Sequence, residues 1–208
     1  MDTRFQHPFC GVLAGPSSSG KTYFVERILK QIDTMINPIP EEVIFCYSAW
    51  QSSYERMKLY FKNIKFIEGI PDFDEIVPNC RRFIIIDDLM QETNEKVTNL
   101  FTRGSHHKNL SVFYICQNLF NKNKEQRSIN LNSHYIIVFK NPRDSSQIIH
   151  LAKQMFPGQT RYMQEAYKMA TSEPFGYLLV DLKQNTPENL RLRSNIFQKD
   201  QQIFYVPK

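Results

Sequence analysis

Residues 9–22 read FCGVLAGPSSSGKT, an apolar run that leads directly into a loop rich in glycine and serine. Beyond the loop, apolar residues recur at the spacing of one helix face, at Phe24, Val25, Ile28, Leu29 and Ile32. The segment therefore predicts a buried strand, a tight loop and a helix, in that order. This order is the repeating unit of an α/β fold with a parallel sheet.

The rest of the chain continues the alternation of strands and helices. Phe83 to Ile86 are four consecutive apolar residues, which is typical of a strand buried on both faces of a parallel sheet. Strands are predicted within residues 41–48, 81–90, 110–118, 134–141 and 175–182, with a weaker candidate at 190–197. Helices are predicted near residues 54–61, 92–102, 145–156 and 160–170, whereas residues 118–134 read as a loop with about one helical turn. We expect a mostly parallel central sheet flanked by helices.

Length and composition limit the class of protein. With 208 residues, 41% of them hydrophobic, the chain is expected to form one domain over residues 1–208, with a core at about 8–182 and a C-terminal strand and tail at about 183–208. The net charge of +5 permits a polyanionic partner without requiring one. No apolar run approaches the roughly 20 residues that span a bilayer, so we expect an intracellular protein. The four cysteines lie far apart, which favours reduced structural thiols over a zinc site.

The loop matches the phosphate-binding pattern G-x-x-x-x-G-K-[S/T] between a predicted strand and a predicted helix. Backbone N–H groups of such a loop turn toward phosphates, its lysine reaches the β- and γ-phosphates, and its last hydroxyl binds Mg²⁺. A serine-rich turn that caps a helix is the less favoured alternative. The sequence thus predicts that ATP and Mg²⁺ bind through Gly15, Pro16, Ser17, Ser18, Ser19, Gly20, Lys21 and Thr22.

Two carboxylates end the most apolar predicted strand. A magnesium nucleotide needs a carboxylate at the end of a neighbouring strand, and Asp87 is the candidate ligand. Asp88 is the candidate that orients or deprotonates the attacking water, with Glu92 as an alternative. Two aspartates could also simply end the strand in a turn.

Gln117 ends the apolar run 110–116. A glutamine amide both donates and accepts hydrogen bonds, so at this place it could sense or position the γ-phosphate. An ordinary polar residue at a strand end is the alternative interpretation.

Taken together, GPSSSGKT, FIIIDDL, LFTRGSHHKNLSVFYICQNLF, YIIVFKNPRD, YLLVDL and LRLRSNIF resemble the genome-packaging ATPases of the FtsK and HerA superfamily. The sequence is most similar to the poxvirus-like branch, found in large eukaryotic DNA viruses, adintoviruses and Polinton (Maverick) transposons. The resemblance extends from Gly15 to about Phe197, which is nearly the whole chain.

The resemblance implies an additional-strand P-loop ATPase with a RecA-like core. It implies a homo-oligomeric ring, pentamer or hexamer, that moves double-stranded DNA into a capsid and contacts capsid vertex proteins, in the host cytoplasm or nucleus or in the virion. In such ATPases an arginine acts on the nucleotide of the neighbouring subunit, which points to Arg103. Ser105 stands where similar sequences often have a second arginine, so Arg127 and Arg143 remain alternatives.

Contacts with DNA are expected to be independent of its sequence and to come from basic loops on phosphates. The candidates are Lys122, Lys124 and Arg127, whose stretch could equally be a solvated basic loop. Arg191 and Arg193 alternate with leucines, and strand pairing or a subunit contact explains them as well as DNA does.

Two other functions fit the phosphate-binding motif. A nucleoside or nucleotide kinase has a similar length, but no convincing arginine-rich lid is present in the sequence. An assembly module that is switched by a nucleotide and moves no DNA would bind ATP without hydrolysing it. The intact set of Lys21, Asp87 and Asp88 argues against such a loss of hydrolysis.

Overall fold

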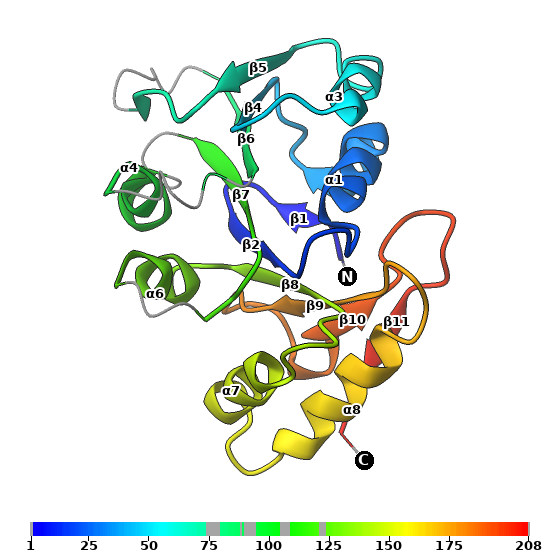
Figure 1. Cartoon of the computed structure of the whole chain (residues 1–208). Coiled ribbons are helices and arrows are strands. Elements are labelled where there is room, and N and C mark those ends of the chain that lie inside the picture. Colours follow the sequence, from blue (N-terminus) through cyan, green and yellow to red (C-terminus); the bar gives the residue numbers. More distant parts are fainter. Residues whose placement is uncertain are drawn as a thin grey trace.

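The strand that precedes the phosphate-binding motif, β2 (Cys10–Ala14), lies between β7 (Leu110–Cys116) and β8 (Tyr135–Phe139) in a large sheet (Figure 1). The computed structural model describes residues 2–73, 80–87, 89, 95–104, 109–120 and 124–207, and for residues 103 and 104 the backbone alone. Among these residues the sheet has nine strands in the order β11-β10-β9-β8-β2-β7-β6-β4-β5. The remaining strands are β4 (Glu42–Tyr47), β5 (Ile64–Glu68), β6 (Arg82–Asp87), β9 (Tyr177–Asp181), β10 (Leu192–Ser194) and β11 (Ile203–Tyr205).

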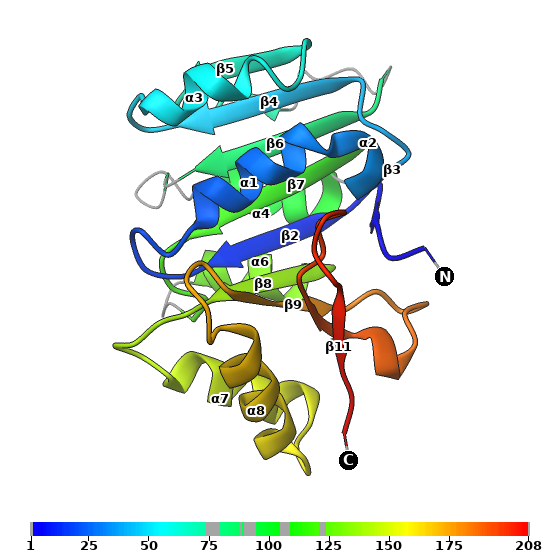
Figure 2. The same ribbon diagram turned by 90° about the vertical axis from the view of Figure 1, so that its right-hand side faces the viewer.

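The strands from β8 across to β5 are all parallel, which confirms the predicted mostly parallel sheet. On the other side of β8, the strands β9, β10 and β11 continue the sheet in antiparallel pairs. Figure 2 shows the arrowheads of β2, β4 and β6 at the same edge of the sheet. We call this the carboxyl edge, because the loops that follow the parallel strands gather there.

Helices cover both faces of the sheet (Figure 1). One face packs against α1 (Lys21–Lys30), α2 (Ile32–Met35) and α3 (Ser52–Met57). The opposite face packs against α4 (Glu95–Asn99), α6 (Lys124–Leu131), α7 (Ser146–Met155) and α8 (Thr160–Ala170). Two short helical segments, Leu100–Gly104 and Glu188–Leu190, complete the described helices. In the part of the chain that the structure describes, no helix has the length and apolar character to cross a membrane.

The continuous apolar runs follow from this layering. In β6, Ile84 and Ile86 belong to the hydrophobic cluster on one face, while Phe83 and Ile85 belong to the cluster on the other. A strand that is buried on both faces needs apolar side chains at every position. Three cysteines are buried in such strands, Cys10, Cys46 and Cys116, which fits the structural role expected of these thiols.

The place of β7 confirms the predicted additional-strand arrangement. It is inserted between β2, which leads into the phosphate-binding motif, and β6, which ends in Asp87. The register pairs Ala14 with Cys116 and Asp87 with Ile115. The ends of three adjacent strands therefore lie nearly level at the carboxyl edge.

The prediction of a loop over residues 118–134 is wrong, because α6 occupies Lys124–Leu131. The helix was missed because only Gln126 and Ile129 of its residues are buried, which leaves a mostly polar sequence. Strands β5 and β11 were also not predicted, nor were the short strands β1 (Phe5–Gln6) and β3 (Ile36–Asn37), which pair with each other.

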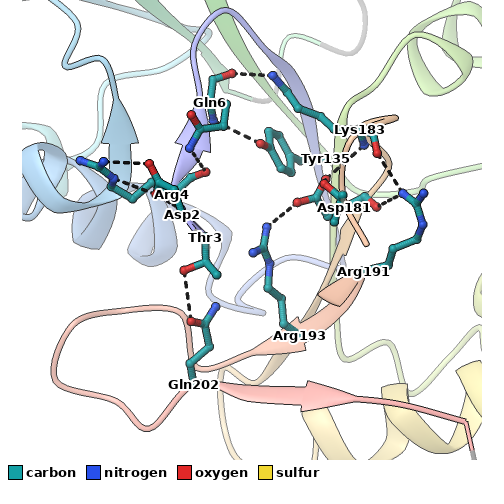
Figure 3. Close-up of polar contacts among 11 residues, drawn as sticks. Asp2, Thr3, Arg4, Gln6, Tyr135, Asp181, Lys183, Arg191, Arg193 and Gln202 are labelled. Atoms are coloured by element: carbon teal, nitrogen blue, oxygen red, sulfur yellow. Dashed lines mark hydrogen bonds and ion pairs between the residues drawn. The ribbon is translucent and has the colours of Figure 1, made fainter. Parts of the chain in front are cut away.

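The N-terminal segment is fixed to the sheet by polar contacts (Figure 3). Lys183 Nζ donates a hydrogen bond of 2.8 Å to the carbonyl oxygen of Gln6. His7 lies 2.5 Å through Nδ1 from Ser111 Oγ and 2.9 Å through Nε2 from Asn109 Oδ1. Burial lowers the pKa of His7, so the neutral ring is favoured in the folded protein.

Candidate active site

The phosphate-binding motif forms a turn between β2 and α1 at the carboxyl edge. Gly15 N–H donates to the carbonyl oxygen of Cys116 at 3.2 Å, which fixes the start of the loop against β7. Ser18 has φ 63° and Gly20 has φ 102°, both in the left-handed region. Alternation of this kind turns successive N–H groups toward one concave side, a form that suits anions. Ser19 Oγ is buried and makes no hydrogen bond within the described part of the chain.

Lys21 reaches back over the loop that precedes it. Its Nζ donates to the carbonyl oxygens of Gly15 at 2.6 Å and of Pro16 at 2.8 Å. The first hydrogen bond of α1 runs from Phe24 N–H to the carbonyl oxygen of Gly20, and helices leave the N–H groups before that point without an intrahelical acceptor. A lysine ammonium and a helix N-terminus thus lie together, which suits a polyphosphate.

Asp87 ends β6 beside the first turn of α1. Its carboxylate is buried, with 4% of the residue exposed, and Thr22 Oγ1 lies 3.5 Å from Asp87 Oδ2. Neighbouring oxygens in an octahedral magnesium shell lie about 3 Å apart, since each is 2.0–2.1 Å from the metal. A hydroxyl and a carboxylate at this separation fit Mg²⁺, which prefers oxygen ligands.

Tyr54 is a residue of this site that the sequence did not reveal. Its hydroxyl donates a hydrogen bond of 3.0 Å to Asp87 Oδ2, and the residue is 1% exposed. The ring packs against Phe45 and Phe66, with centroid distances of 4.8 and 5.5 Å. Tyr54 therefore holds the carboxylate in one orientation. No spacing in the sequence links the two residues, because the contact depends on how α3 packs beside β4.

Gln117 follows β7 and lies at the same place. A cavity of about 180 Å³ is lined by Lys21, Thr22, Asp87 and Gln117 together with Ser17, Ser18, Gln51, Ile115 and Cys116. The structure thus brings together the lysine, the hydroxyl, the first carboxylate and the glutamine that the sequence singled out. Gln51 is a second residue of this cavity that was not predicted.

Several predicted residues cannot be placed at the cavity. Asp88, Glu92 and Lys122 lie outside the described residues, so their roles stay predictions. For Arg103 the backbone alone is described, in the segment Leu100–Gly104.

The position of that segment restricts what Arg103 could do. Its neighbour Thr102 lines a cavity with Ser133 and His134, which precede β8. Because β8 runs parallel to β2, residues that precede β8 lie at the edge opposite the phosphate-binding motif. Arg103 is therefore placed away from the nucleotide cavity of its own chain. Arg143, by contrast, follows β8 at the carboxyl edge, and its side chain is exposed.

Two of the three candidates for contact with DNA lie on a helix and not, as expected, in a loop. Lys124 and Arg127 are both exposed residues of α6. Arg127 also lines a separate, mostly apolar cavity of about 420 Å³ with Phe120 and Met155.

The second basic pair has a structural explanation (Figure 3). Arg193 is 3% exposed and donates to Asp181 Oδ2 at 2.6 Å. Arg191 donates through Nη1 to the carbonyl oxygens of Asp181 and Lys183 at 3.1 and 3.0 Å. Strand pairing of β9 and β10 accounts for both arginines, and burial excludes Arg193 from contact with DNA.

Comparison with known proteins supports the fold. No family model matches the sequence, and no curated protein matches it. Among solved structures, the DNA-packaging ATPase B204 from Sulfolobus turreted icosahedral virus is similar with a TM-score of 0.56 and 13% identity over 100% of both chains. The genome-packaging NTPase B204 from Sulfolobus turreted icosahedral virus 2 is similar in complex with ATP-gammaS, at a TM-score of 0.52 and 14% identity over 96% of this chain and 98% of that one. Its complex with AMPPCP gives a TM-score of 0.54 and 12% identity over 97% and 98%. The chain therefore has the fold of these viral packaging NTPases.

Proposed function

We propose that this protein is a magnesium-dependent ATPase that drives double-stranded DNA into a viral capsid. The observation that carries the proposal is the convergence of Lys21, Thr22, Asp87 and Gln117 on one cavity at the ends of three adjacent strands. The fold shared with the viral packaging NTPases supports the proposal. The assignment to the poxvirus-like branch of the FtsK and HerA superfamily rests on the sequence resemblance.

The roles of the residues follow from the cavity. The loop Gly15–Thr22 and Lys21 bind the phosphates, and Thr22 and Asp87 would hold Mg²⁺. Mg²⁺ held there would neutralise part of the negative charge of the phosphates. Asp88 orients the attacking water, and Gln117 forms hydrogen bonds that depend on the presence of the γ-phosphate.

We further propose that the active form is a homo-oligomeric ring. An arginine from the neighbouring subunit, with Arg103 as the first candidate, stabilises charge that develops on the γ-phosphate. Because the Leu100–Gly104 segment lies away from the cavity of its own chain, Arg103 could act only on the nucleotide of a neighbour. Lys124 and Arg127, with Lys122, would grip DNA phosphates without regard to base sequence. Capsid vertex proteins are the expected docking partners, in the host cytoplasm or nucleus or in the virion.

The decisive experiment measures ATP turnover with and without long duplex DNA, on material whose oligomeric state is determined in the same sample. We expect stimulation by DNA in the oligomer. Lys21→Ala should reduce turnover by about 100-fold or more, and Asp88→Asn should leave ATP bound but not hydrolysed. Hydrolysis by Asp88→Asn at the parent rate would refute the role of Asp88.

Other outcomes would point to other functions. Tight binding of ATP with negligible turnover under every condition would support a nucleotide-switched assembly module. Transfer of the γ-phosphate to a nucleoside in a substrate screen would support a small-molecule kinase.

A further inference from the structure

A second cavity lies beside the first turn of α1. It has a volume of about 420 Å³, and the residues that matter for its chemistry are Gly20, Tyr23, Arg27, Met169, Phe175 and Asn195. We call it the side cavity. Its walls come from α1, from the end of α8 with the loop that follows, and from the segment that joins β10 to β11.

The side cavity and the nucleotide cavity flank the same four consecutive residues. Lys21 and Thr22 line the nucleotide cavity, whereas Gly20 and Tyr23 line the side cavity. A ligand whose phosphates occupy the first cavity would extend past the start of α1 into the second. A nucleoside triphosphate has this shape, with a polar chain at one end and a flat base at the other.

Phe175 presents an aromatic ring at the boundary between the two cavities. Its backbone has φ 60°, a conformation that bulky residues rarely adopt, and the residue is 58% exposed. A Cβ atom placed on Gly20 would lie 2.9 Å from Phe175 Cδ1, so the ring lies directly against the phosphate-binding turn. The ring centroids of Phe175 and Tyr23 are 6.0 Å apart at an interplanar angle of 52°. A strained backbone that holds an exposed ring against a binding loop is a feature of ligand sites.

We propose that the side cavity receives the nucleobase and that the base stacks against Phe175, with Tyr23 as a second contact. This inference rests on the proposed function, because it requires phosphates in the nucleotide cavity.

The side cavity is suited to stacking against the face of a base, and less suited to hydrogen bonds that distinguish one base from another. Ser194 Oγ and Tyr205 Oη lie 2.9 Å apart and form a hydrogen bond with each other. Arg27 donates to Asp200 Oδ2 at 2.8 Å, and its guanidinium lies 3.9 Å from the ring centroid of Phe197. These polar groups are thus engaged within the protein.

The other polar residues of the wall are open to water. Glu173 and Asn195 are exposed, so a hydrogen bond from either to a base would replace one to water and add little selectivity. Stacking on an aromatic ring tolerates every base, because each base has a π-face. ATP and GTP should therefore bind with affinities within about tenfold of each other.

The test compares ATP, GTP and inorganic tripolyphosphate by calorimetric titration in the presence of Mg²⁺. Tripolyphosphate carries the phosphates without a base. Phe175→Gly removes the ring and suits the left-handed backbone, so it should fold, and it should weaken ATP binding by about tenfold while tripolyphosphate binding is unchanged. Phe175→Tyr should retain ATP binding. Leu131→Ala, a truncation of an exposed apolar residue on α6, is the matched control and should change neither ligand.

Three results would overturn the inference. The first is an unchanged ATP affinity in Phe175→Gly with an unchanged melting temperature. The second is equal affinity of the parent protein for ATP and tripolyphosphate, which would leave the proposed function intact but remove the role of the base. The third is a preference for ATP over GTP above about 100-fold, which would show readout of the base edge. If the parent protein bound neither ATP nor tripolyphosphate, the proposed function would be refuted, and this inference with it.

Discussion

Replacement of Tyr54 by phenylalanine tests the link between α3 and the magnesium site. The substitution removes one hydroxyl, whose hydrogen bond of 3.0 Å reaches a carboxylate on a residue that is 4% exposed. Hydrogen bonds to charged groups contribute about 1.5–3 kcal/mol, and the loss of one leaves Asp87 with less compensation for its burial. For a chain of this size each kcal/mol corresponds to about 2–4 °C, so the melting temperature should fall by about 3–12 °C.

The same substitution should weaken metal binding. Partners that orient a metal ligand typically contribute 10–100-fold in affinity, so the Mg²⁺ concentration at half-maximal turnover should rise by about that factor. Turnover at saturating Mg²⁺ should change much less, because Tyr54 is proposed to position Asp87 and not to contact the substrate. The assay is phosphate release over a Mg²⁺ titration at fixed ATP, with thermal unfolding measured on the same samples.

Tyr60→Phe is the matched control. The Tyr60 hydroxyl donates to Glu26 at 3.4 Å, away from the nucleotide cavity, so its loss should leave the Mg²⁺ requirement unchanged. A lower Mg²⁺ requirement in Tyr54→Phe would show that the phenol competes with the metal for Asp87 Oδ2. That outcome would refute the reasoning, as would an effect no larger than that of Tyr60→Phe.

Three further substitutions test other parts of the structure. Gly20→Ala should lower the melting temperature and weaken tripolyphosphate binding, because residue 20 has φ 102° and a Cβ atom would meet an aromatic ring at 2.9 Å. The pKa of His7 is lowered in the folded protein, so its contribution to stability is present above the ordinary value near 6.5 and is lost as the pH falls through the folded-state pKa. His7→Gln should therefore make the free energy of unfolding depend less on pH between about pH 5 and 7.5. Arg193→Met leaves the buried carboxylate of Asp181 without its ion pair at 2.6 Å and should cost about 3–5 kcal/mol by chemical denaturation, whereas the double variant with Asp181→Leu should recover part of that loss.

The strands nearest the site could be predicted from the sequence because burial on both faces leaves a continuous apolar run. This holds for β2, β6 and β7, and the polar residues that end them mark the carboxyl edge. Strand β5 lies at the edge of the sheet and has only partly buried or exposed residues, so its sequence contains no apolar run that would predict a strand. Helix α6 buries only two of its eight residues, so its sequence lacks the apolar face that would have predicted a helix.

The sequence could predict only those residues of the candidate site that lie in the phosphate-binding motif or next to the end of a predicted strand. Gln117 directly follows the end of β7, and Lys21 begins α1 after the loop that follows β2. Tyr54 and Gln51 reach the same cavity through the packing of α3 and the loop before it, which no spacing encodes. Phe175 was not found because it lies in a turn after α8, and its closeness to Gly20 depends on the folded chain.

The pairing of β7 along both of its sides has a mechanical consequence. Five residue pairs join it to β2 and six join it to β6, so an axial displacement of this strand would break two ladders at once. Strand β7 is therefore held on both sides against sliding along its own axis. A motion that begins at Gln117 would therefore have to reach neighbouring segments without displacing β7 along its axis.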